Sequence, residues 1–221
     1  MPTYVNYTSL FSDIQAYLER GGATSDPVVF AQIPRLINAA ERKIMQTLKL
    51  QGTIEVLRDP VGLPQGNFTI AKPDRWRETI SLSYGAGANN NAIAPLYPRS
   101  LEFCQQYWPD SSVQDTAQPP LFYADLDYSN IYIVPTAPAA YPTQGVFYMQ
   151  PQLLDSGNQS NFFTQYTPNL LLYGALLEAA PFLKGDERIA TWQGLWDRDA
   201  ATLVGMALQR ILDRTANRVR P

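Results

Sequence analysis

The sequence predicts an α+β fold: an α-helical bundle built from N- and C-terminal helices, with an inserted antiparallel β domain. Apolar residues recur at helical spacing in the first part of the chain, and the same spacing returns near its end. Between these parts, short runs rich in β-branched and aromatic residues are separated by proline and glycine turns. We therefore expect a bundle domain of residues 1–50 and 164–221, and an inserted β-rich domain of residues 51–163.

Two helices are expected in the N-terminal part. The first begins after Thr8 or Ser9, ends at Gly21-Gly22, and carries apolar residues at helical spacing, Leu10, Ile14, Tyr17 and Leu18. Asp26-Pro27 starts the second, which Pro34 kinks or restarts. Its apolar face is formed by Leu36, Ile37, Ala40, Ile44 and Leu48. Glu41 and Arg42 fall outside this set, and we expect them on a solvated face.

The middle of the chain is expected to form strands. Segments with strand character are residues 53–57, 67–70, 78–84, 93–97, 121–123, 130–134 and 145–149. Alternation in the third segment places Ile80, Leu82 and Tyr84 on one face. A flexible loop of residues 85–91 follows, and Ser100 caps a short helix of residues 101–108. The last three segments complete an antiparallel set, separated by proline-rich turns.

Two successive helices are expected near the C-terminus. Thr167 is the expected N-cap of the first, with Pro168 at its first position. Leucine and alanine then cover most of its circumference, so it must be buried in a bundle or against a neighbouring subunit. The second helix starts at Asp186-Glu187, whose charges suit a helix start better than an acidic site. One stripe runs along it, formed by Ile189, Trp192, Trp196, Leu203, Ala207 and Ile211.

Composition excludes several classes of function. The chain has no histidine, which removes Ser-His-Asp and Cys-His nucleophile pairs and the commonest zinc and iron ligand sets. A net charge of −3 argues against tight DNA binding, because the chain has no overall positive field. Cys104, the single cysteine, cannot form an internal disulfide and indicates a reducing compartment. Neither a membrane-spanning run nor a signal peptide is evident, so synthesis in a cytoplasm is expected. We expect no catalytic, cofactor-binding or metal-binding residues.

Asp125 and Asp127 leave two interpretations open. Paired carboxylates would suit glycoside hydrolysis, which makes a glycan-binding or cell-wall-degrading protein the alternative function. A turn between two strands is the other interpretation, because aspartate there bonds its own backbone. The tyrosines would suit stacking on bases or sugars, but without interleaved basic residues they favour sheet packing or interfaces. These are Tyr4, Tyr7, Tyr97, Tyr107, Tyr123, Tyr128 and Tyr132.

Four arginines form the one charge cluster of interest. Arg210, Arg214 and Arg218 are spaced four residues apart and share a helical face, and Arg220 follows in the tail. They would either complement the negative end of the helix or form a docking arm for acidic groups or phosphates on a partner. Asn89, Asn90 and Asn91, in the flexible loop, form a second candidate contact.

Three segments together resemble a known family. They are Ser25-Asp26-Pro27, residues 33–44 with the sequence IPRLINAAERKI, and the C-terminal pair PNLLLYGALLEAAPFL and DERIATWQGLWDRDAATL. The proline-bounded aromatic strands of residues 120–123 and 146–149, and residues 159–166, fit as well. The family is the bacteriophage head-to-tail adaptor, and the chain is similar to the tail tubular protein A of short-tailed phages. The resemblance covers most of the chain and consists of helix faces rather than a catalytic signature.

The resemblance implies a non-enzymatic structural protein at the head–tail interface of the virion. In the family, a homo-oligomeric ring of about twelve copies docks beneath the portal protein, and C-terminal segments contact the portal. The lower face receives the tail nozzle or tail tube, β domains support tail fibres, and genomic double-stranded DNA passes through without specific binding. Arg210, Arg214, Arg218 and Arg220 then become portal-docking candidates, and Asn89 to Asn91 candidates for contact with the nozzle or a neighbour. A neck connector of a long-tailed phage remains an open alternative.

Overall fold

A computed structural model describes residues 5–19, 22–86, 92–183 and 187–216 of the chain. The chain divides into two compact units, one formed by residues 1–53 and 151–221 and the other by residues 54–150. In the described residues, the first unit contains helices, whereas the second contains all the strands and one short helix. The expected α+β class is therefore confirmed.

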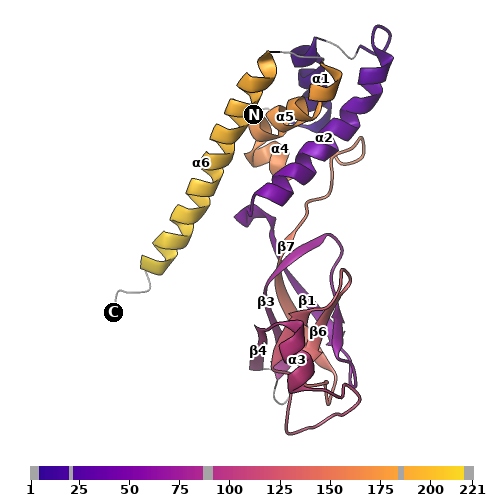
Figure 1. The fold of residues 1–221 in the computed structure, drawn as a ribbon, viewed down its shortest axis with the longest axis vertical. Coiled ribbons are helices and arrows are strands. Elements are labelled where there is room, and N and C mark those ends of the chain that lie inside the picture. Colours follow the sequence, from indigo (N-terminus) through magenta and orange to yellow (C-terminus); the bar gives the residue numbers. More distant parts are fainter. Residues whose placement is uncertain (1–4, 20–21, 87–91, 184–186, 217–221) are drawn as a thin grey trace. The chain divides into compact units, whose positions relative to one another are not determined.

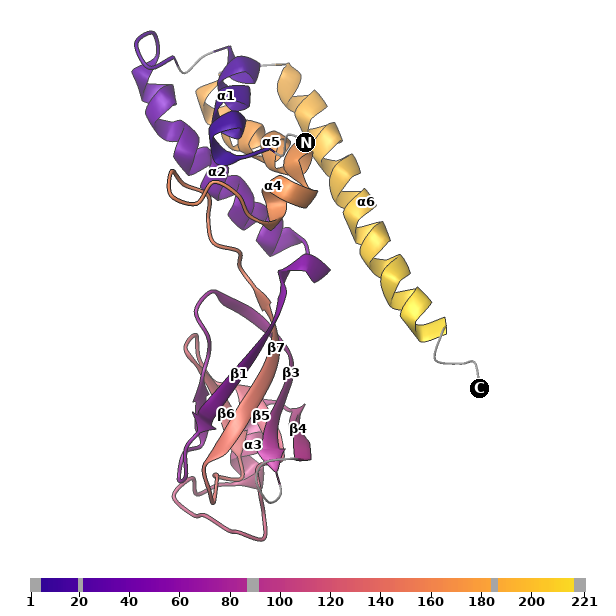
Figure 2. The same cartoon turned by 180° about the vertical axis from the view of Figure 1, so that it is seen from behind.

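The helical unit is organised around a central helix. Its described elements are α1 (Tyr7–Leu18), α2 (Pro27–Thr47), η1 (Gln51–Thr53), α4 (Phe162–Tyr166), α5 (Pro168–Glu178), η3 (Ala180–Phe182) and α6 (Arg188–Ala216). Helix α5 contacts α1, α2, α4 and α6, and Figures 1 and 2 show α2 and α6 on either side of it. The helix that the sequence makes apolar nearly all round thus occupies the centre of the unit.

Side chains one residue upstream fix the starts of α1 and α2. Asn6 accepts a hydrogen bond from the N–H of Ser9 and returns one from its own N–H to the Ser9 hydroxyl, a capping box. Helix α1 therefore begins earlier than the predicted start after Thr8 or Ser9. Asp26 caps α2 as predicted, and α2 continues as one helix through Pro34.

The core of the unit confirms the predicted apolar faces of α2 and α5. All five predicted residues are buried: Leu36, Ile37, Ala40 and Ile44 on α2, and Leu48 directly after its end. On α5, Leu170, Leu171, Ala175 and Leu176 are buried as well. Gly174 lets the flanking helices approach, because a Cβ there would lie 3.1 Å from the Cβ of Ala40 and 3.5 Å from Nε1 of Trp196.

Thr167 occupies the N-cap position of α5 as predicted, but its hydroxyl does not make the expected hydrogen bond to the first turn. The hydroxyl instead donates to the carbonyl oxygen of Phe163 at 3.3 Å. The reason is α4, a short helix that precedes α5 and whose start is capped by Asn161; the local sequence pattern does not distinguish it from α5. Because α4 leads directly into α5, Thr167 belongs to the end of one helix as well as the start of the next. Pro168 occupies the first position of α5, as predicted.

Helix α6 is the longest element described. Its 29 residues are continuous and span about 43 Å at 1.5 Å per residue. Trp192 and Trp196 are buried, and Ile189, Leu203 and Ala207 are half-buried, so the predicted stripe is confirmed over this stretch. The side chain of Ile211 and the predicted helix start at Asp186 lie outside the described residues.

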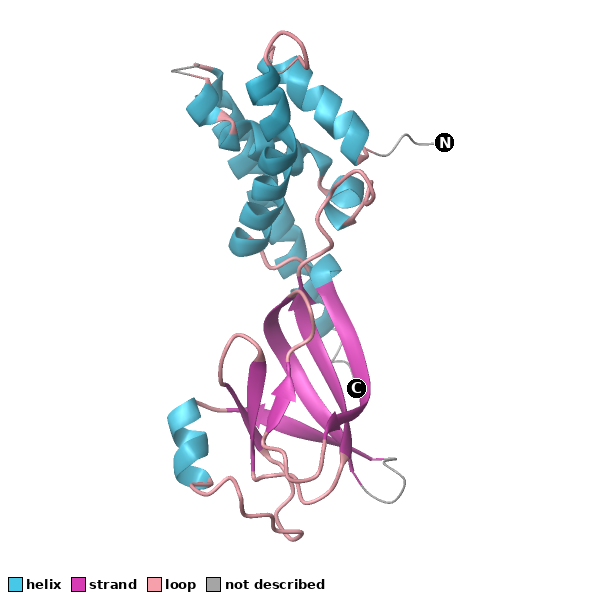
Figure 3. Ribbon diagram, turned by 90° about the vertical axis from the view of Figure 1, so that its right-hand side faces the viewer, coloured by secondary structure: helices cyan, strands magenta, loops and turns pink. Residues whose placement is uncertain are grey.

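The β unit is one sheet of seven strands with the order β1-β7-β3-β4-β5-β6-β2. The strands are magenta in Figure 3. Its elements are β1 (Ile54–Leu63), β2 (Thr69–Ala71), β3 (Trp76–Ala86), β4 (Ala92–Pro98), α3 (Leu101–Tyr107), β5 (Phe122–Asp125), β6 (Asn130–Val134) and β7 (Tyr141–Met149). The edge strands β1 and β2 also contact each other, so the sheet curls.

The sheet is mixed rather than antiparallel as predicted. Strands β4 and β5 pair in parallel, with Tyr97 opposite Phe122, whereas the other neighbours are antiparallel. Parallel neighbours need a long connection, and α3 with its flanking loops provides it. Ser100 caps α3 as predicted, and Cys104 anchors the helix against the buried side chains of Ala124, Tyr132 and Val134.

A β-bulge changes the predicted alternation in β3. Leu82 and Tyr84 are buried as expected, but Ile80 is 43% exposed. The pairing of β3 with β7 shifts register between Thr79 and Ser81, so Ile80 is the extra residue of a bulge. An extra residue turns the following side chains to the other face, which separates Ile80 from Leu82 and Tyr84.

Candidate functional site

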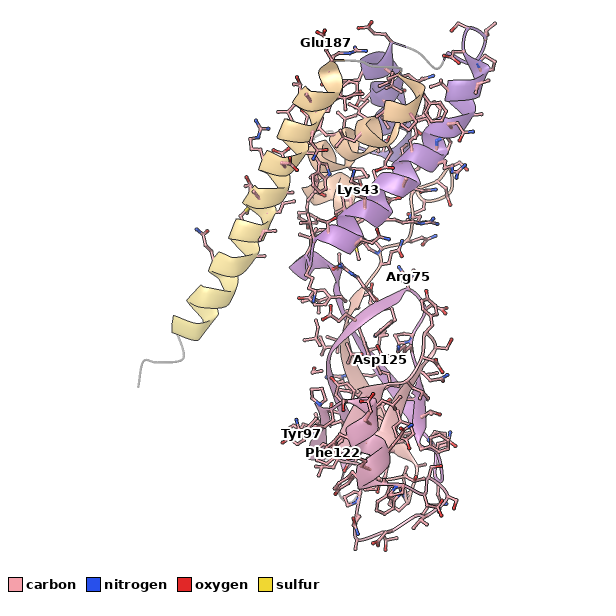
Figure 4. All side chains as sticks on the ribbon, viewed as in Figure 1. Lys43, Arg75, Tyr97, Phe122, Asp125 and Glu187 are labelled. Atoms are coloured by element: carbon pink, nitrogen blue, oxygen red, sulfur yellow. The ribbon has the colours of Figure 1, made fainter. Side chains whose placement is uncertain are left out.

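The outer face of α2 forms a polar concavity of about 630 Å³. Arg35 and Arg42 are exposed on it, and Asn38, Gln46 and the α5 residue Glu178 also line it. Among the described residues, neither arginine makes an ion pair or a hydrogen bond. Lys43, labelled in Figure 4, is engaged: its Nζ lies 3.2 Å from Oε1 of Glu178 and 5.6 Å from the ring centroid of Trp196.

Glu41 is fully buried, so the prediction that it lies on a solvated face is wrong. Its carboxylate accepts hydrogen bonds from the N–H of Leu154, at 3.1 Å, and from the side-chain amide of Asn161. The amide of Asn38, oriented with its nitrogen inward, donates to Glu41 at 3.0 Å and to the carbonyl of Leu154 at 3.1 Å. The available sequence signal was spacing, because Glu41 follows the core residue Ile37 by four residues and therefore shares its face.

Burial raises the pKa of Glu41 to about 7. The hydrogen bonds from Leu154 and Asn161 and the charge of Arg42 act in the opposite direction, because each favours the ionised carboxylate. Glu41 therefore fixes the segment of residues 151–161 on α2 and titrates near neutrality. Its surroundings offer no open space for a substrate, so its role is structural.

An apolar groove lies between α4 and the second half of α6. It has a volume of about 500 Å³ and is lined by Leu50, Phe162, Tyr166, Leu203 and Met206, among others. Tyr166 is 69% exposed and Met206 is 48% exposed. Exposed apolar side chains gathered on one side of a unit are typical of interaction surfaces.

In the β unit, Asp127 is a turn residue. Its Oδ1 accepts hydrogen bonds from the N–H of Ser129 at 2.6 Å and from the N–H of Asn130 at 2.8 Å. Lys72, whose side chain is almost fully buried, donates to the carboxylate of Asp125 and to the carbonyl of Asp127. Of the two interpretations left open, the turn is therefore the one that the structure shows for Asp127.

The arrangement of the two aspartates does not suit glycoside hydrolysis. Hydrogen bonds from Asn130 and Ser129 lower the pKa of Asp127, whereas a general acid needs a raised pKa. A concavity of about 510 Å³ is lined by Trp76, Arg99 and Asp125, but Asp127 is not among its lining residues. The two carboxylates therefore do not face one shared space.

An aromatic cluster covers the surface around α3. The ring of Phe122 is in edge contact with Phe103 at 5.3 Å and with Tyr107 at 5.1 Å between centroids. The guanidinium of Arg99 lies 5.4 Å from the centroid of Phe122, and Tyr97, opposite Phe122 in the sheet, is 49% exposed (Figure 4). Aromatic rings combined with arginine are typical of protein interfaces.

The predicted interaction residues fall largely outside what the structure describes. Arg210 and Arg214 belong to the last turns of α6, but their side chains are not described. Arg218, Arg220, Asn89, Asn90 and Asn91 lie outside the described residues altogether. In the described part, no group of three or more histidine, cysteine, aspartate or glutamate side chains is placed to hold a metal ion. No described helix is both long and apolar enough to cross a bilayer.

Comparison with known proteins gives one family. Residues 5–221 match the family described as SU10 adaptor protein, so the match includes both units. No curated protein matched the sequence.

Proposed function

From the premise that this chain belongs to the SU10 adaptor protein family, we propose that it forms the ring joining the portal of a phage head to its tail. The family makes it a structural, generally non-enzymatic component of the phage particle that contacts other virion proteins. The match over residues 5–221 is the observation that carries the proposal. Ring formation from about twelve copies, docking on the portal and reception of the tail nozzle are the proposed steps.

We assign ring formation and portal docking to the helical bundle, with the β-rich part as an insertion that faces tail components. The assignment is supported by α6, which continues past its buried residues Trp192 and Trp196 toward the arginines at its end. Arg210, Arg214, Arg218 and Arg220 are the proposed portal-docking residues. Guanidinium groups bind carboxylates and phosphates in a bidentate manner, which suits a docking arm.

The proposed ring also continues the channel through which DNA leaves the head. With −3 per chain, about twelve copies would carry roughly −36, screened beyond about 8–10 Å at physiological salt. Tight DNA binding depends on neutralisation of phosphates by lysine and arginine, so an acidic wall lets DNA pass without sticking. Low charge, at 17% of residues, also suits a chain with large subunit contacts.

Two further details belong to the proposal. Likeness to the tail tubular protein A of short-tailed phages favours a nozzle as the partner below the ring, with tail fibres attached to the β part. The same family assignment is compatible with a neck connector in a long-tailed phage. The glycan-degrading alternative has no comparable support, because Asp127 is held in its turn.

Native mass spectrometry tests the proposal. The purified chain, of 24.7 kDa, would be measured alone and after mixing with the portal protein of the same virus. We expect a portal complex that gains a ring of about a dozen copies. A stable monomer or dimer that ignores the portal would contradict the adaptor function.

A further inference from the structure

Two outer faces of the helical unit carry unbalanced charge of opposite sign. On α2, Arg35 and Arg42 are exposed on the side away from the buried residues Ile37 and Ile44. Seven residues separate the two arginines, which places them about 10 Å apart along one side of the helix. Within the described part of the chain, neither has an ion-pair or hydrogen-bond partner. This surface, Arg35 with Arg42, is the basic face.

Glu187, directly before α6, and Asp197, on α6 on the side away from Trp192 and Trp196, are both exposed. Glu187 lies at the N-terminal end of α6 in Figure 4. Asp197 accepts a hydrogen bond from Gln193 of the same helix, at 2.9 Å, which leaves its charge uncompensated. This surface, Glu187 with Asp197, is the acidic face.

The remaining charges at the start of α6 cancel within the unit. Arg198 donates to Asp199 with two nitrogens, both at 3.0 Å. A guanidinium nitrogen of Arg188 lies 3.2 Å from the carboxylate of Glu19, which directly follows α1. The charge left on the outer surface of this part of α6 is therefore negative.

The acidic face also carries small residues. Ala190, Gly194, Ala201 and Gly205 are exposed on the same side of α6. A Cβ added at Gly194 or Gly205 would meet no heavy atom within 4 Å, so the packing of the described residues does not require either glycine. Glycine is less favourable than alanine inside a helix, and its absence of a side chain lets another backbone or a long side chain approach closely.

The two faces cannot meet within one copy. Helices α2 and α6 both pack on α5, and the two opposite views in Figures 1 and 2 show them on either side of it. A second copy of the chain supplies the missing complement to each face. We propose that the basic face of one copy docks on the acidic face of the next copy. This inference rests on the proposed ring and names the contact that would build it.

The geometry of this contact is that of a ring. A contact between two different faces of identical chains is heterologous, and repetition of one such contact closes into a ring when the rotation fits. The alternative occupant of the basic face is nucleic acid. Two arginines separated by about 10 Å neutralise few phosphates, and the lining by Glu178 opposes such binding.

Charge reversal in the full chain tests the contact. One variant carries R35E and R42E, and another carries E187K and D197K. In a sample of either variant by itself, like charges oppose each other at every contact. We therefore expect its self-association, in solution or on the portal, to weaken by at least about tenfold. An equimolar mixture of the two variants opposes unlike charges again, so we expect assemblies in which the two masses alternate. Native mass spectrometry and sedimentation give both readouts.

The control variant, R58E with R75E, changes net charge as much as R35E with R42E but at exposed positions of the β unit. We expect it to assemble like the wild type, and circular dichroism checks folding of every variant. If both reversed variants assemble as the wild type does, or if their mixture fails to assemble, the inferred contact is wrong and the proposed function is unaffected. The inference is also overturned if R35E with R42E loses DNA binding but keeps self-association. A wild-type protein that self-associates neither alone nor on the portal overturns the proposed function as well.

Discussion

The carboxylate of Glu41 accepts a hydrogen bond from the backbone N–H of Leu154 at 3.1 Å, although 113 residues separate the two in the sequence. Leu154 is itself 1% exposed and belongs to the core of the helical unit. Asn161 donates a second hydrogen bond, and Asn38 a third, so three donors converge on one buried carboxylate. Glu41 thereby holds residues 151–161 on α2, where the chain returns to the helical unit.

The first prediction concerns the pH dependence of stability. Burial raises the pKa of Glu41 from its ordinary value of 4.5 to about 7. Between these values the folded protein binds more protons than the unfolded chain, so the free energy of unfolding falls as pH rises and levels off above pH 7. The contribution of Glu41 to this fall is at most about 3 kcal/mol. Urea unfolding followed by circular dichroism, at pH 5.5 and pH 8, measures it.

The variant E41Q cannot titrate, so the fall between the two pH values becomes smaller than in the wild type. The control is D13N, which removes an exposed carboxylate of α1 and leaves the dependence unchanged. Identical pH dependence in E41Q and the wild type would show that Glu41 does not titrate in this range. The position of Glu41 among three donors would then keep it ionised throughout.

Local patterns in the sequence predict most elements but not their ends. The apolar residues on one face of α2 predict its burial directly, because helical periodicity reflects a single buried face. The apolar circumference of α5 likewise predicts its central position. The cap of α1 is different: Asn6, Thr8 and Ser9 are all good capping residues, and the reciprocal bond between Asn6 and Ser9 decides among them. Thr167 likewise ends α4 and precedes α5, and its hydroxyl bonds to the carbonyl of Phe163 rather than capping α5.

Pairing between distant strands explains the other differences. The bulge at Ile80 depends on the register of β3 against β7, and the parallel pair depends on where α3 returns the chain. Neither register nor strand order is contained in the alternation of one segment. The hydrogen bonds of buried Glu41 likewise come from Leu154 and Asn161, which are distant in the sequence, so a local pattern does not predict them.

The second prediction concerns Lys72. Its Nζ lies 3.7 Å from the ring centroid of Trp76 and bridges Asp125 and the carbonyl of Asp127. The side chain of Lys72 is 2% exposed, so K72M removes a buried bridging charge while keeping the length of the side chain. We expect a loss of about 1–3 kcal/mol in the unfolding free energy of the β unit. Hydrogen exchange of peptides from β5 and β6 measures it, with R58M as the control; equal protection in K72M and wild type would contradict the prediction.

The third prediction separates the turn from the glycosidase interpretation. The variant D127A removes the acceptor of two backbone N–H bonds, so it should lower the unfolding temperature of the β unit relative to the wild type. A zymogram on bacterial cell wall should show no clearing by the wild type. Clearing by the wild type that D125N and D127N abolish would instead support a hydrolase.

The fourth prediction concerns two helical glycines with different surroundings. Gly194 faces open space, so G194A should stabilise the isolated protein by about 0.5–1 kcal/mol through helix propensity. Gly174 lies against Ala40 and Trp196, so G174V should destabilise it by about 1–3 kcal/mol through overpacking. Thermal unfolding of both variants gives the comparison. Opposite signs are required, and a destabilising G194A would mean that α6 packs differently from the described arrangement.

The last prediction concerns the C-terminal arm. Deletion of residues 217–221 removes Arg218 and Arg220 and should weaken binding to the portal at least about tenfold, because guanidinium pairs with acidic groups are lost. The fold should remain intact, because Trp192, Trp196 and Ala200, the buried residues of α6 among its described side chains, precede the deletion by many residues. Surface plasmon resonance with immobilised portal measures binding, and circular dichroism checks the fold. A control with R218K and R220K keeps the charge and should lose less affinity than the deletion. If the deletion binds the portal as the wild type does, the docking arm is wrong and the contact must lie elsewhere on the helical unit.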